Sequence, residues 1–162
     1  MRKLLFFILI SLIFACNSQL DKAIVYNNTL LEEQQGIGKE IKSYLDLVKD
    51  TSQSLSIEEA KKQLLINIEN SIIKVDNISD YNGNSEFKES VTSVLKAYLE
   101  GVKYEYDAVV TYQLLPSSEK TQEKKWKAEQ HAIHADKNIS EKEDYFILMQ
   151  QKFAQENNID LD

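Results

Sequence analysis

The sequence predicts an all-α protein, an antiparallel up-down four-helix bundle with long helices. Through four consecutive segments, apolar residues recur at spacings of three, four and seven, which is the helical period, and no segment alternates in the manner of a strand. The 162 residues include only four Gly and one Pro, which is few for a loop-rich β-sandwich or a Gly-rich nucleotide-binding fold. Short connections between long consecutive helices imply antiparallel neighbours within one domain.

The first residues predict export. Arg2 and Lys3 form a positive start, and Leu4–Ala15 is an apolar stretch interrupted only by Ser11. A helix needs about 20 apolar residues to span a bilayer core, so this stretch is too short to do so. A charged start, a short apolar stretch and a small residue before a cleavage site are typical of a secretory signal peptide.

The only cysteine, Cys16, directly follows this stretch and is preceded by Ile13, Phe14 and Ala15. This arrangement resembles the lipobox of bacterial lipoprotein precursors. The resemblance implies cleavage before Cys16, lipidation of its sulfur and attachment through acyl chains, of which two or more hold a protein stably on a membrane. The alternative is an incidental thiol beside an uncleaved anchor. The expected organisation is a cleaved signal peptide, a lipidated tether, a helical bundle domain and a short C-terminal tail, at 1–15, 16–21, 22–157 and 158–162.

Composition and charge exclude several function classes. Cleavage removes Arg2, Lys3 and no acidic residue, so the formal net charge falls by two from -7 to -9 and no arginine remains. An acidic surface repels nucleic acid and anionic lipid, so we expect no nucleic-acid partner and membrane affinity from the acyl chains alone. A single cysteine excludes a disulfide framework and multi-cysteine metal sites.

The first helix is expected from Asp21 to about Lys49, where the apolar residues follow the helical period. Gly36 and Gly38 lie inside this pattern, and each costs up to about 1 kcal/mol relative to alanine. They indicate a kink, a close helix contact or simply a locally weakened helix.

The second helix is expected to begin at Ser56, which forms a capping box with Glu59, and to end near Asn77. An Asn-Gly turn then leads to a third helix of about 30 residues with Ser85 as its N-cap. Leu114 and Leu115 precede Pro116, and this helix is expected to stop there because proline disfavours helix in the residue before it.

The fourth helix is expected from about Ser117 to about Asn157, either continuous or bent at a second capping box formed by Ser140 and Glu143. Its apolar residues are expected on one face: Trp126, Ile133, Phe146, Met149 and Phe153.

The two histidines, His131 and His134, lie three residues apart and therefore on one face of the fourth helix. They could contribute to a metal or ligand site, or they could be a solvated pair without a ligand. Ala128 and His131 occupy the positions where a carboxylate-bridged di-metal bundle carries glutamate, so that motif is absent. We predict no metal site and no cofactor.

The only tryptophan, Trp126, lies among lysines and glutamates. One interpretation is a contact patch for a lipid surface or a protein partner. The other is a core tryptophan covered by the methylenes of Lys120, Lys124, Lys125 and Lys127.

Three residues, Tyr26, Asn27 and Gln34, place polar groups on or beside the apolar stripe of the first helix. Buried polar groups need partners, and one of them can fix the register of a bundle, although these side chains could also line a small cavity. The third helix is rich in tyrosine, and most of these rings are expected at core and flanking positions. They are Tyr98, Tyr104, Tyr106 and Tyr112.

No catalytic constellation is recognisable. Lipidation consumes Cys16, no Gly-x-Ser-x-Gly elbow occurs, and no carboxylate is distinguished by its setting. We expect a non-enzymatic protein, and a hydrolase that uses scattered carboxylates is the remaining enzymatic alternative.

Two segments, Tyr26–Gln34 and Phe153–Leu161, carry a wider resemblance. The first is a Tyr-Asn pair that opens a Leu- and Gln-rich helix, and the second closes the chain. With them the chain resembles a family of small, all-helical bacterial surface lipoproteins of unknown function. The resemblance implies a cell-envelope location and a helical fold, and it implies no active site.

The expected function is that of a lipid-anchored envelope protein that acts through an envelope protein partner, either as an interaction module or as a structural one. Asn17 and Ser18 supply neither an inner-membrane retention aspartate nor an acidic export run, which favours the outer membrane and leaves its face open. The alternative is a small-ligand or metal-binding envelope lipoprotein that draws on His131, His134 and the polar residues Asn27 and Gln34.

Overall fold

The computed structural model describes the backbone of residues 2–49 and 54–161 and the side chains of residues 19–49 and 56–161. Within these residues the protein is all-α and contains no strand, which confirms the predicted fold class. The elements are α1 (Arg2–Val48), α2 (Ser54–Asn77), α3 (Glu86–Glu100), the π-helical turn η2 (Gly101–Glu105), α4 (Tyr106–Leu114), the 3₁₀ turn η3 (Ser117–Glu119) and α5 (Gln122–Glu156).

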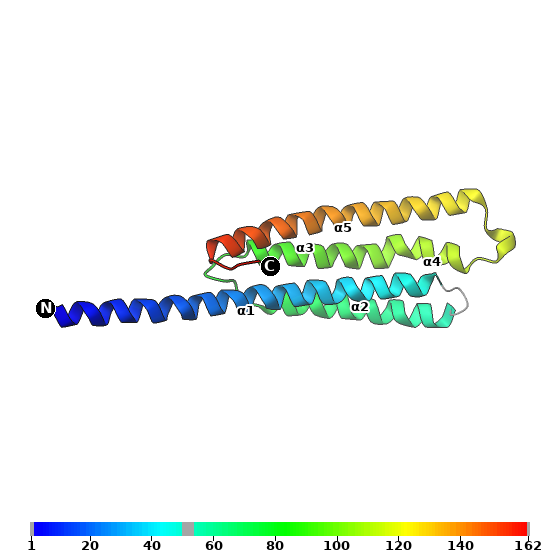
Figure 1. The fold of residues 1–162 in the computed structure, drawn as a ribbon. Helices are drawn as coiled ribbons and strands as arrows, with labels where there is room; N and C mark the ends of the chain where they lie inside the picture. Colours follow the sequence, from blue (N-terminus) through cyan, green and yellow to red (C-terminus); the bar gives the residue numbers. More distant parts are fainter. Residues whose placement is uncertain (1, 50–53, 162) are drawn as a thin grey trace.

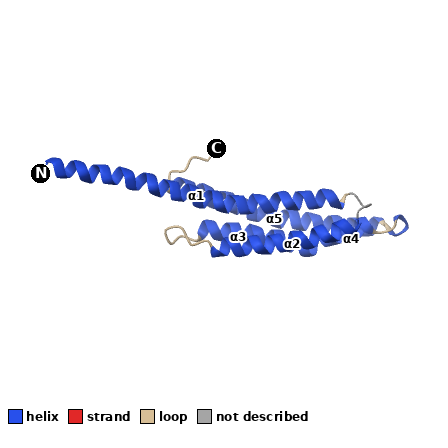
Figure 2. Ribbon diagram, turned by 90° about the horizontal axis from the view of Figure 1, so that it is seen from below, coloured by secondary structure: helices blue, strands red, loops and turns tan. Residues whose placement is uncertain are grey.

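Four long helical segments run up and down along one axis (Figure 1). They are α1, α2, the continuous run α3–η2–α4, and α5. The third segment holds the bundle together, because α3 packs against α1, α2 and α5 while α4 packs against α5. Direct contacts between α1 and α5 are sparse by comparison. In Figure 2 the helices again lie along one direction with short loops at their ends.

The two ends of the bundle differ. At what we call the near end, residues 19–27 of α1 meet the α2–α3 connection and the C-terminal residues, as the hydrogen bond from the Tyr81 hydroxyl to the Gln19 carbonyl (3.0 Å) shows. The far end carries the α4–α5 connection, residues 115–121 (Figure 1).

The core contains fully buried side chains from α1, α2 and the third segment, including Leu30, Ile57, Ile68, Leu95 and Val102. At the near end it becomes an aromatic cluster that joins α1, the α2–α3 connection, α3 and α5. Neighbouring ring centroids in this cluster lie 5.2 to 6.3 Å apart, within the range in which aromatic pairs attract. Its members are Tyr26, Tyr81, Phe87, Phe146 and Phe153.

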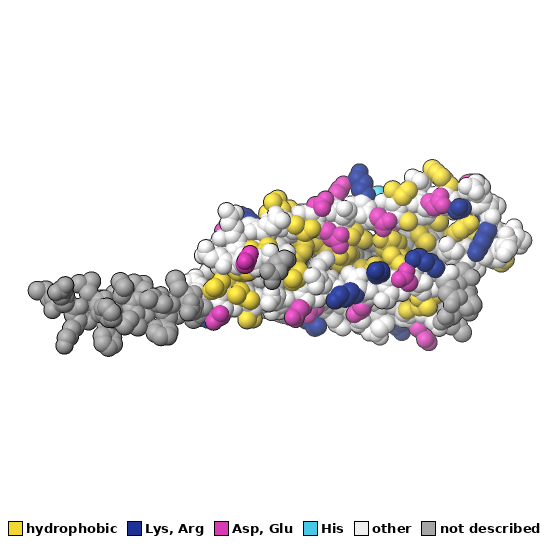
Figure 3. All heavy atoms as spheres, in the orientation of Figure 1, with side chains coloured by type: hydrophobic (Ala, Val, Ile, Leu, Met, Phe, Trp, Pro, Cys, Tyr) yellow, Lys and Arg dark blue, Asp and Glu magenta, His cyan; other side chains and the backbone are white. Residues whose placement is uncertain are grey.

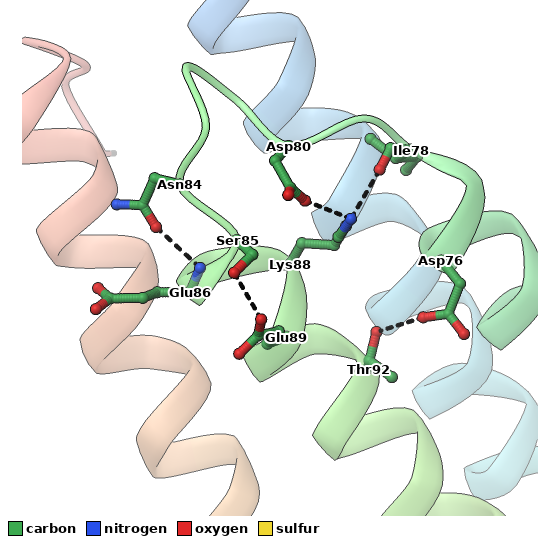
Figure 4. Close-up of polar contacts among 9 residues, drawn as sticks. All are labelled: Asp76, Ile78, Asp80, Asn84, Ser85, Glu86, Lys88, Glu89 and Thr92. Carbon is green, nitrogen blue, oxygen red and sulfur yellow. Dashed lines mark hydrogen bonds and ion pairs between the residues drawn. The ribbon is translucent and has the colours of Figure 1, made fainter.

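The α2–α3 connection contains the predicted Asn-Gly turn, with positive φ angles at Asn82 (51°) and Gly83 (76°). The Asn84 side chain accepts a hydrogen bond from the Glu86 amide (2.9 Å), as Figure 4 shows. Ser85 occupies the predicted N-cap position of α3, but its side chain does not cap the helix and donates instead to Glu89 (2.6 Å).

The predicted capping box at the start of α2 is wrong. The helix begins at Ser54, so Ser56 and Glu59 lie inside it and Ser56 is not the N-cap. The helix ends at Asn77, as predicted. The polar connection expected before α2 lies largely in residues 50–53, outside the described part of the chain.

The third segment ends at Leu114, as predicted from Pro116 two residues later. It contains the π-helical turn η2, which was not predicted. This turn begins at Gly101, where α5 comes close. A Cβ atom at Gly101 would lie 3.4 Å from Cδ1 of Ile139 and 3.8 Å from Cβ of Ala135.

The helix α5 is continuous, so the Ser140–Glu143 pair neither breaks nor restarts it. It starts where the Thr121 side chain accepts a hydrogen bond from the Lys124 amide (3.3 Å).

The single apolar face predicted for α5 is wrong. Phe146 and Phe153 are buried, whereas Trp126 and Ile133 are exposed. Each exposed residue precedes a buried phenylalanine by 20 positions, which is about five and a half helical turns and therefore the opposite side of the helix.

The first helix, α1, begins at Arg2. Residues 16–21, which were expected to form a tether, are therefore helical. The side chain of Cys16 and the signal-peptide side chains lie outside the described side chains. In the described part of the chain, no helix combines the length and apolar character that crossing a membrane requires.

Candidate functional site

The residues singled out in the sequence do not form one site. Asn27 lies at the near end, where it contacts Gln150 of α5. His131 precedes Gln150 by 19 residues on the same helix, which places it about 28 Å away along the axis. Gln34 lies between these two levels, beside Tyr98. The candidate residues Asn27, Gln34 and the histidine pair therefore do not line one common pocket.

The two histidines converge on a carboxylate that the sequence analysis did not identify. The Nδ1 atom of His131 lies 2.6 Å from one oxygen of Glu105, and Nδ1 of His134 lies 3.0 Å from the other. These contacts lower the pKa of Glu105, with the His131 hydrogen bond as the largest cause. Glu105 is the last residue of η2, so the π-helical turn and α5 are joined here.

This arrangement differs from a preformed metal site. Each imidazole engages its own carboxylate oxygen, and both rings are largely exposed. In the ranges that the structure describes, no group of three or more His, Cys, Asp and Glu side chains is arranged to hold a metal ion.

The middle of the bundle is joined by a chain of three polar side chains. The Gln34 amide donates to the Tyr98 hydroxyl (2.9 Å), and that hydroxyl donates to Glu143 (2.5 Å). Tyr98 is only 4% exposed, and burial together with the Glu143 carboxylate raises its pKa. The chain links α1, α3 and α5, so the half-buried Gln34 contributes a polar contact that helps to fix how these helices align.

The side-chain amide of Asn27 is also hydrogen-bonded inside the protein. It is 4% exposed, accepts a hydrogen bond from Gln150 (3.3 Å) and donates one to Asn28 (3.1 Å). It also lines a groove of about 690 Å³ between α1, α5 and the C-terminal residues. Five side-chain amides line this groove, from Asn27, Asn28, Gln35, Gln150 and Asn158.

Tyr26 is a member of the aromatic cluster and is buried. Its hydroxyl has no hydrogen-bond partner among the described residues, and burial raises its pKa. Tyr26 therefore contributes to core packing and does not line the groove beside Asn27.

Trp126 is 56% exposed, so the interpretation of this residue as a core tryptophan is wrong. Two of its lysine neighbours are engaged elsewhere, because Lys127 pairs with Glu123 (2.7 Å) and Lys120 donates to the Gln113 carbonyl (2.8 Å).

Trp126 is one of several exposed apolar side chains on α5. We call the side of the helix that carries them the α5 outer face. Trp126, Ile133 and Ile147 follow one another at multiples of seven residues and so lie along one side of the helix. The α5 outer face comprises Trp126, Ile133, Ile147 and Leu148.

Contiguous exposed apolar surface is typical of binding sites, and on this face Trp126 and Ile133 lie two helical turns apart. This helix face and the groove beside Asn27 are the candidate sites. No protein-family model, curated protein or solved structure matches this chain.

Proposed function

We propose that this protein is a lipid-anchored helical bundle of the bacterial cell envelope that acts without catalysis, as a protein-interaction or structural module. Its anchor is the acylated Cys16, and the membrane is the outer one. The position of the only cysteine directly after the short apolar stretch supports the anchor.

The observation that carries the interaction role is the exposure of Trp126. Tryptophan is among the residues most enriched in the energetically dominant part of protein interfaces. In this protein it is continued along α5 by Ile133, which is 58% exposed, and by Leu148, which is 57% exposed.

The position of Trp126 favours a protein partner over the anchoring membrane. Trp126 precedes Gln150 by 24 residues on α5, which places it about 36 Å farther from the near end. The anchor residue Cys16 precedes the near-end residues 19–27 in α1. The α5 outer face therefore extends away from the attachment point.

The anchor is tested by Cys16→Ser in the native cell. We expect the substitution to abolish incorporation of labelled fatty acid and to move the protein from the membrane fraction to the soluble fraction. Unchanged labelling contradicts the anchor, whatever the partner experiment gives.

The interaction role is tested by placing a photo-crosslinking amino acid at position 126 and irradiating intact cells. The matched control carries the same group at Lys62, which is exposed on α2. We expect one reproducible adduct from position 126 and none from position 62. Adducts that are identical at both positions, or absent at both, contradict a partner-binding α5 outer face.

The groove beside Asn27 favours a second candidate function, the binding of a small uncharged polar ligand. Its volume lies within the range of ligand sites, and its five amides can donate and accept hydrogen bonds. Native mass spectrometry of the protein purified from its own cells tests this function, with Gln150→Ala expected to lose the bound species. Elemental analysis of wild type and the His131→Ala/His134→Ala variant tests the metal-binding form of this alternative.

A further inference from the structure

The two histidines of α5 are held by one carboxylate, and this contact fixes which of their ring nitrogens are free. Nδ1 of His131 lies 2.6 Å from Oε2 of Glu105, and Nδ1 of His134 lies 3.0 Å from Oε1. An ionised carboxylate only accepts hydrogen bonds, so each Nδ1 carries the proton. In a neutral imidazole the other nitrogen, Nε2, then carries a lone pair.

Both lone pairs belong to side chains that are open to solvent. The side chain of His131 is 51% exposed and that of His134 is 72% exposed. Among the described residues, the hydrogen bonds of both rings end on Glu105. In Figure 3 a histidine side chain (cyan) reaches the upper edge of the molecule, where α5 lies. Side chains three residues apart on a helix are neighbours, with Cβ atoms about 5–6 Å apart, so one ion can be shared by the two rings.

The backbone that carries the pair is fixed by the π-helical turn η2. The Tyr106 amide donates to the Gly101 carbonyl five residues earlier. The consecutive residues Glu105 and Tyr106 then both bond to α5, and Tyr106 does so through Asp136 (2.7 Å). Next to Asp136, Ala135 is 2% exposed and packs close to Gly101. A rigid backbone on both sides favours a preorganised site, and π-helical turns are frequent at functional sites.

Histidines that bind metals use the same arrangement. A metal-ligating imidazole almost always donates its other N–H to a carboxylate, a carbonyl or water, which fixes the tautomer and makes the ligating nitrogen more basic. Glu105 gives this support to both rings at once. Imidazole nitrogens suit Cu²⁺, Ni²⁺ and Zn²⁺, whereas Mg²⁺ and Ca²⁺ prefer oxygen.

The charges around the pair leave room for a cation. Lys127 pairs with Glu123 (2.7 Å), and Lys137 lies 3.9 Å from Glu141. On η2, Lys103 lies over a tyrosine ring, 5.4 Å from its centroid. The chain as a whole has a formal net charge of -7, which attracts cations.

We propose that Nε2 of His131 and Nε2 of His134 together bind one exchangeable divalent ion of the copper and zinc class, with Glu105 as the positioning residue behind both rings. In the described ranges no third His, Cys, Asp or Glu completes a closed metal site, so water or an added ligand fills the other positions of the ion. This inference gives the metal-binding alternative its ligand atoms and its metal class. It depends neither on the anchor nor on a partner for the α5 outer face.

The test titrates the full chain in detergent with Cu²⁺ and follows the fluorescence of Trp126, the only tryptophan. Bound Cu²⁺ quenches a nearby indole, and Trp126 precedes His131 by five residues, about 7.5 Å along the axis. We expect quenching that saturates at one ion per chain, reversal by excess Zn²⁺ and no reversal by Mg²⁺. Electron paramagnetic resonance of the Cu²⁺ form should show two nitrogen ligands.

Three variants separate the ligands from the positioning residue. His131→Ala and His134→Ala change exposed positions, and each is expected to leave one nitrogen ligand and a weaker complex. Glu105→Gln should weaken Cu²⁺ binding by about tenfold or more and still show two nitrogen ligands, because it loses the charge behind the rings and not a ligand. The matched control, Glu129→Gln, removes the same charge from an exposed position on α5 and should keep wild-type affinity.

Four results overturn this inference. They are the absence of saturable quenching, quenching that persists unchanged in the double variant His131→Ala/His134→Ala, a single nitrogen ligand in the wild type, and equal affinities of Glu105→Gln and Glu129→Gln. The second result identifies adventitious binding elsewhere on the chain. None of them bears on the proposed anchor or partner, which are tested by Cys16→Ser and by crosslinking from position 126.

Discussion

The hydroxyl of Tyr98 donates a 2.5 Å hydrogen bond to Glu143 and accepts a 2.9 Å hydrogen bond from Gln34. This single buried group connects α3 to α5 and to α1. The contact therefore joins three of the four helical segments at one level of the bundle.

Removing the Tyr98 hydroxyl tests this role. We expect Tyr98→Phe to lower the free energy of unfolding by about 1–2 kcal/mol, since Glu143 and Gln34 both lose a partner in a largely buried place. Urea denaturation followed by circular dichroism measures the change. An unchanged midpoint would mean that water replaces the hydroxyl without cost.

Unlike Tyr98, Tyr44 on α1 buries a hydroxyl that makes no hydrogen bond with the described residues. It is 3% exposed, and its hydroxyl has no hydrogen-bond partner among the described residues. Burial raises the pKa of Tyr44 to about 12. We expect Tyr44→Phe to be neutral or to stabilise the protein by up to about 1 kcal/mol, because the variant no longer buries an unsatisfied group. A loss as large as that of Tyr98→Phe in the same urea titration contradicts this account.

The Glu105 carboxylate predicts a dependence of stability on pH. Its pKa in the folded protein is lowered, chiefly by the His131 hydrogen bond, whereas in the unfolded chain it returns to its usual value of 4.5. The stabilisation is therefore present above pH 4.5 and is lost as the pH falls through the lowered pKa. We expect the stability difference between wild type and Glu105→Gln to shrink on acidification from pH 6 to pH 3. Thermal unfolding measures it, and a constant difference contradicts a charge-dependent contact.

The glycines Gly36 and Gly101 predict different responses to alanine. A Cβ at Gly36 would contact nothing within 4 Å, whereas at Gly101 it would contact Ile139, Tyr106 and Ala135. We expect Gly36→Ala to raise the free energy of unfolding by about 0.5–1 kcal/mol through helix propensity. Gly101→Ala should bring no gain, because crowding against α5 offsets the propensity. Equal gains in urea titrations show that the close approach at η2 carries no constraint.

Trp126 provides an intrinsic probe of the α5 outer face, since it is the only tryptophan. We expect emission typical of a solvent-exposed indole and efficient quenching by acrylamide, both independent of folding. Trp126→Ala should change stability by less than about 0.5 kcal/mol, as exposed substitutions do. A blue-shifted, protected emission in the isolated protein contradicts the exposed position.

The parts of the fold that could be predicted from the sequence are those that depend on short stretches of neighbouring residues. The end of α1 near Lys49, the end of α2 at Asn77, the Asn82–Gly83 turn and the stop before Pro116 each depend on a few neighbouring residues, and each is found where expected. The capping box at Ser56 was wrong because α2 begins two residues earlier, at Ser54. A short motif cannot fix a helix start to within one or two residues.

The candidate residues were predictable as types but not as contacts. Histidine spacing placed His131 and His134 on one face, but their partner Glu105 comes from a segment 26 residues earlier, through a π-helical turn with no recognised sequence signal. Trp126 was grouped with Phe146 because both are apolar, although their separation by half-integral turns sets them on opposite sides of α5.

The sequence by itself determined that the chain is all-helical, since periodicity and the scarcity of Gly and Pro are local properties, and it placed the lone Cys16 where an anchor is expected. Only the tertiary structure decided which polar groups meet. Tyr98 contacts Glu143, Glu105 contacts both histidines, and Asn27 meets Gln150 beside an amide-lined groove. The physical reason is that helix period fixes a residue's face, whereas the packing of faces depends on every side chain between them.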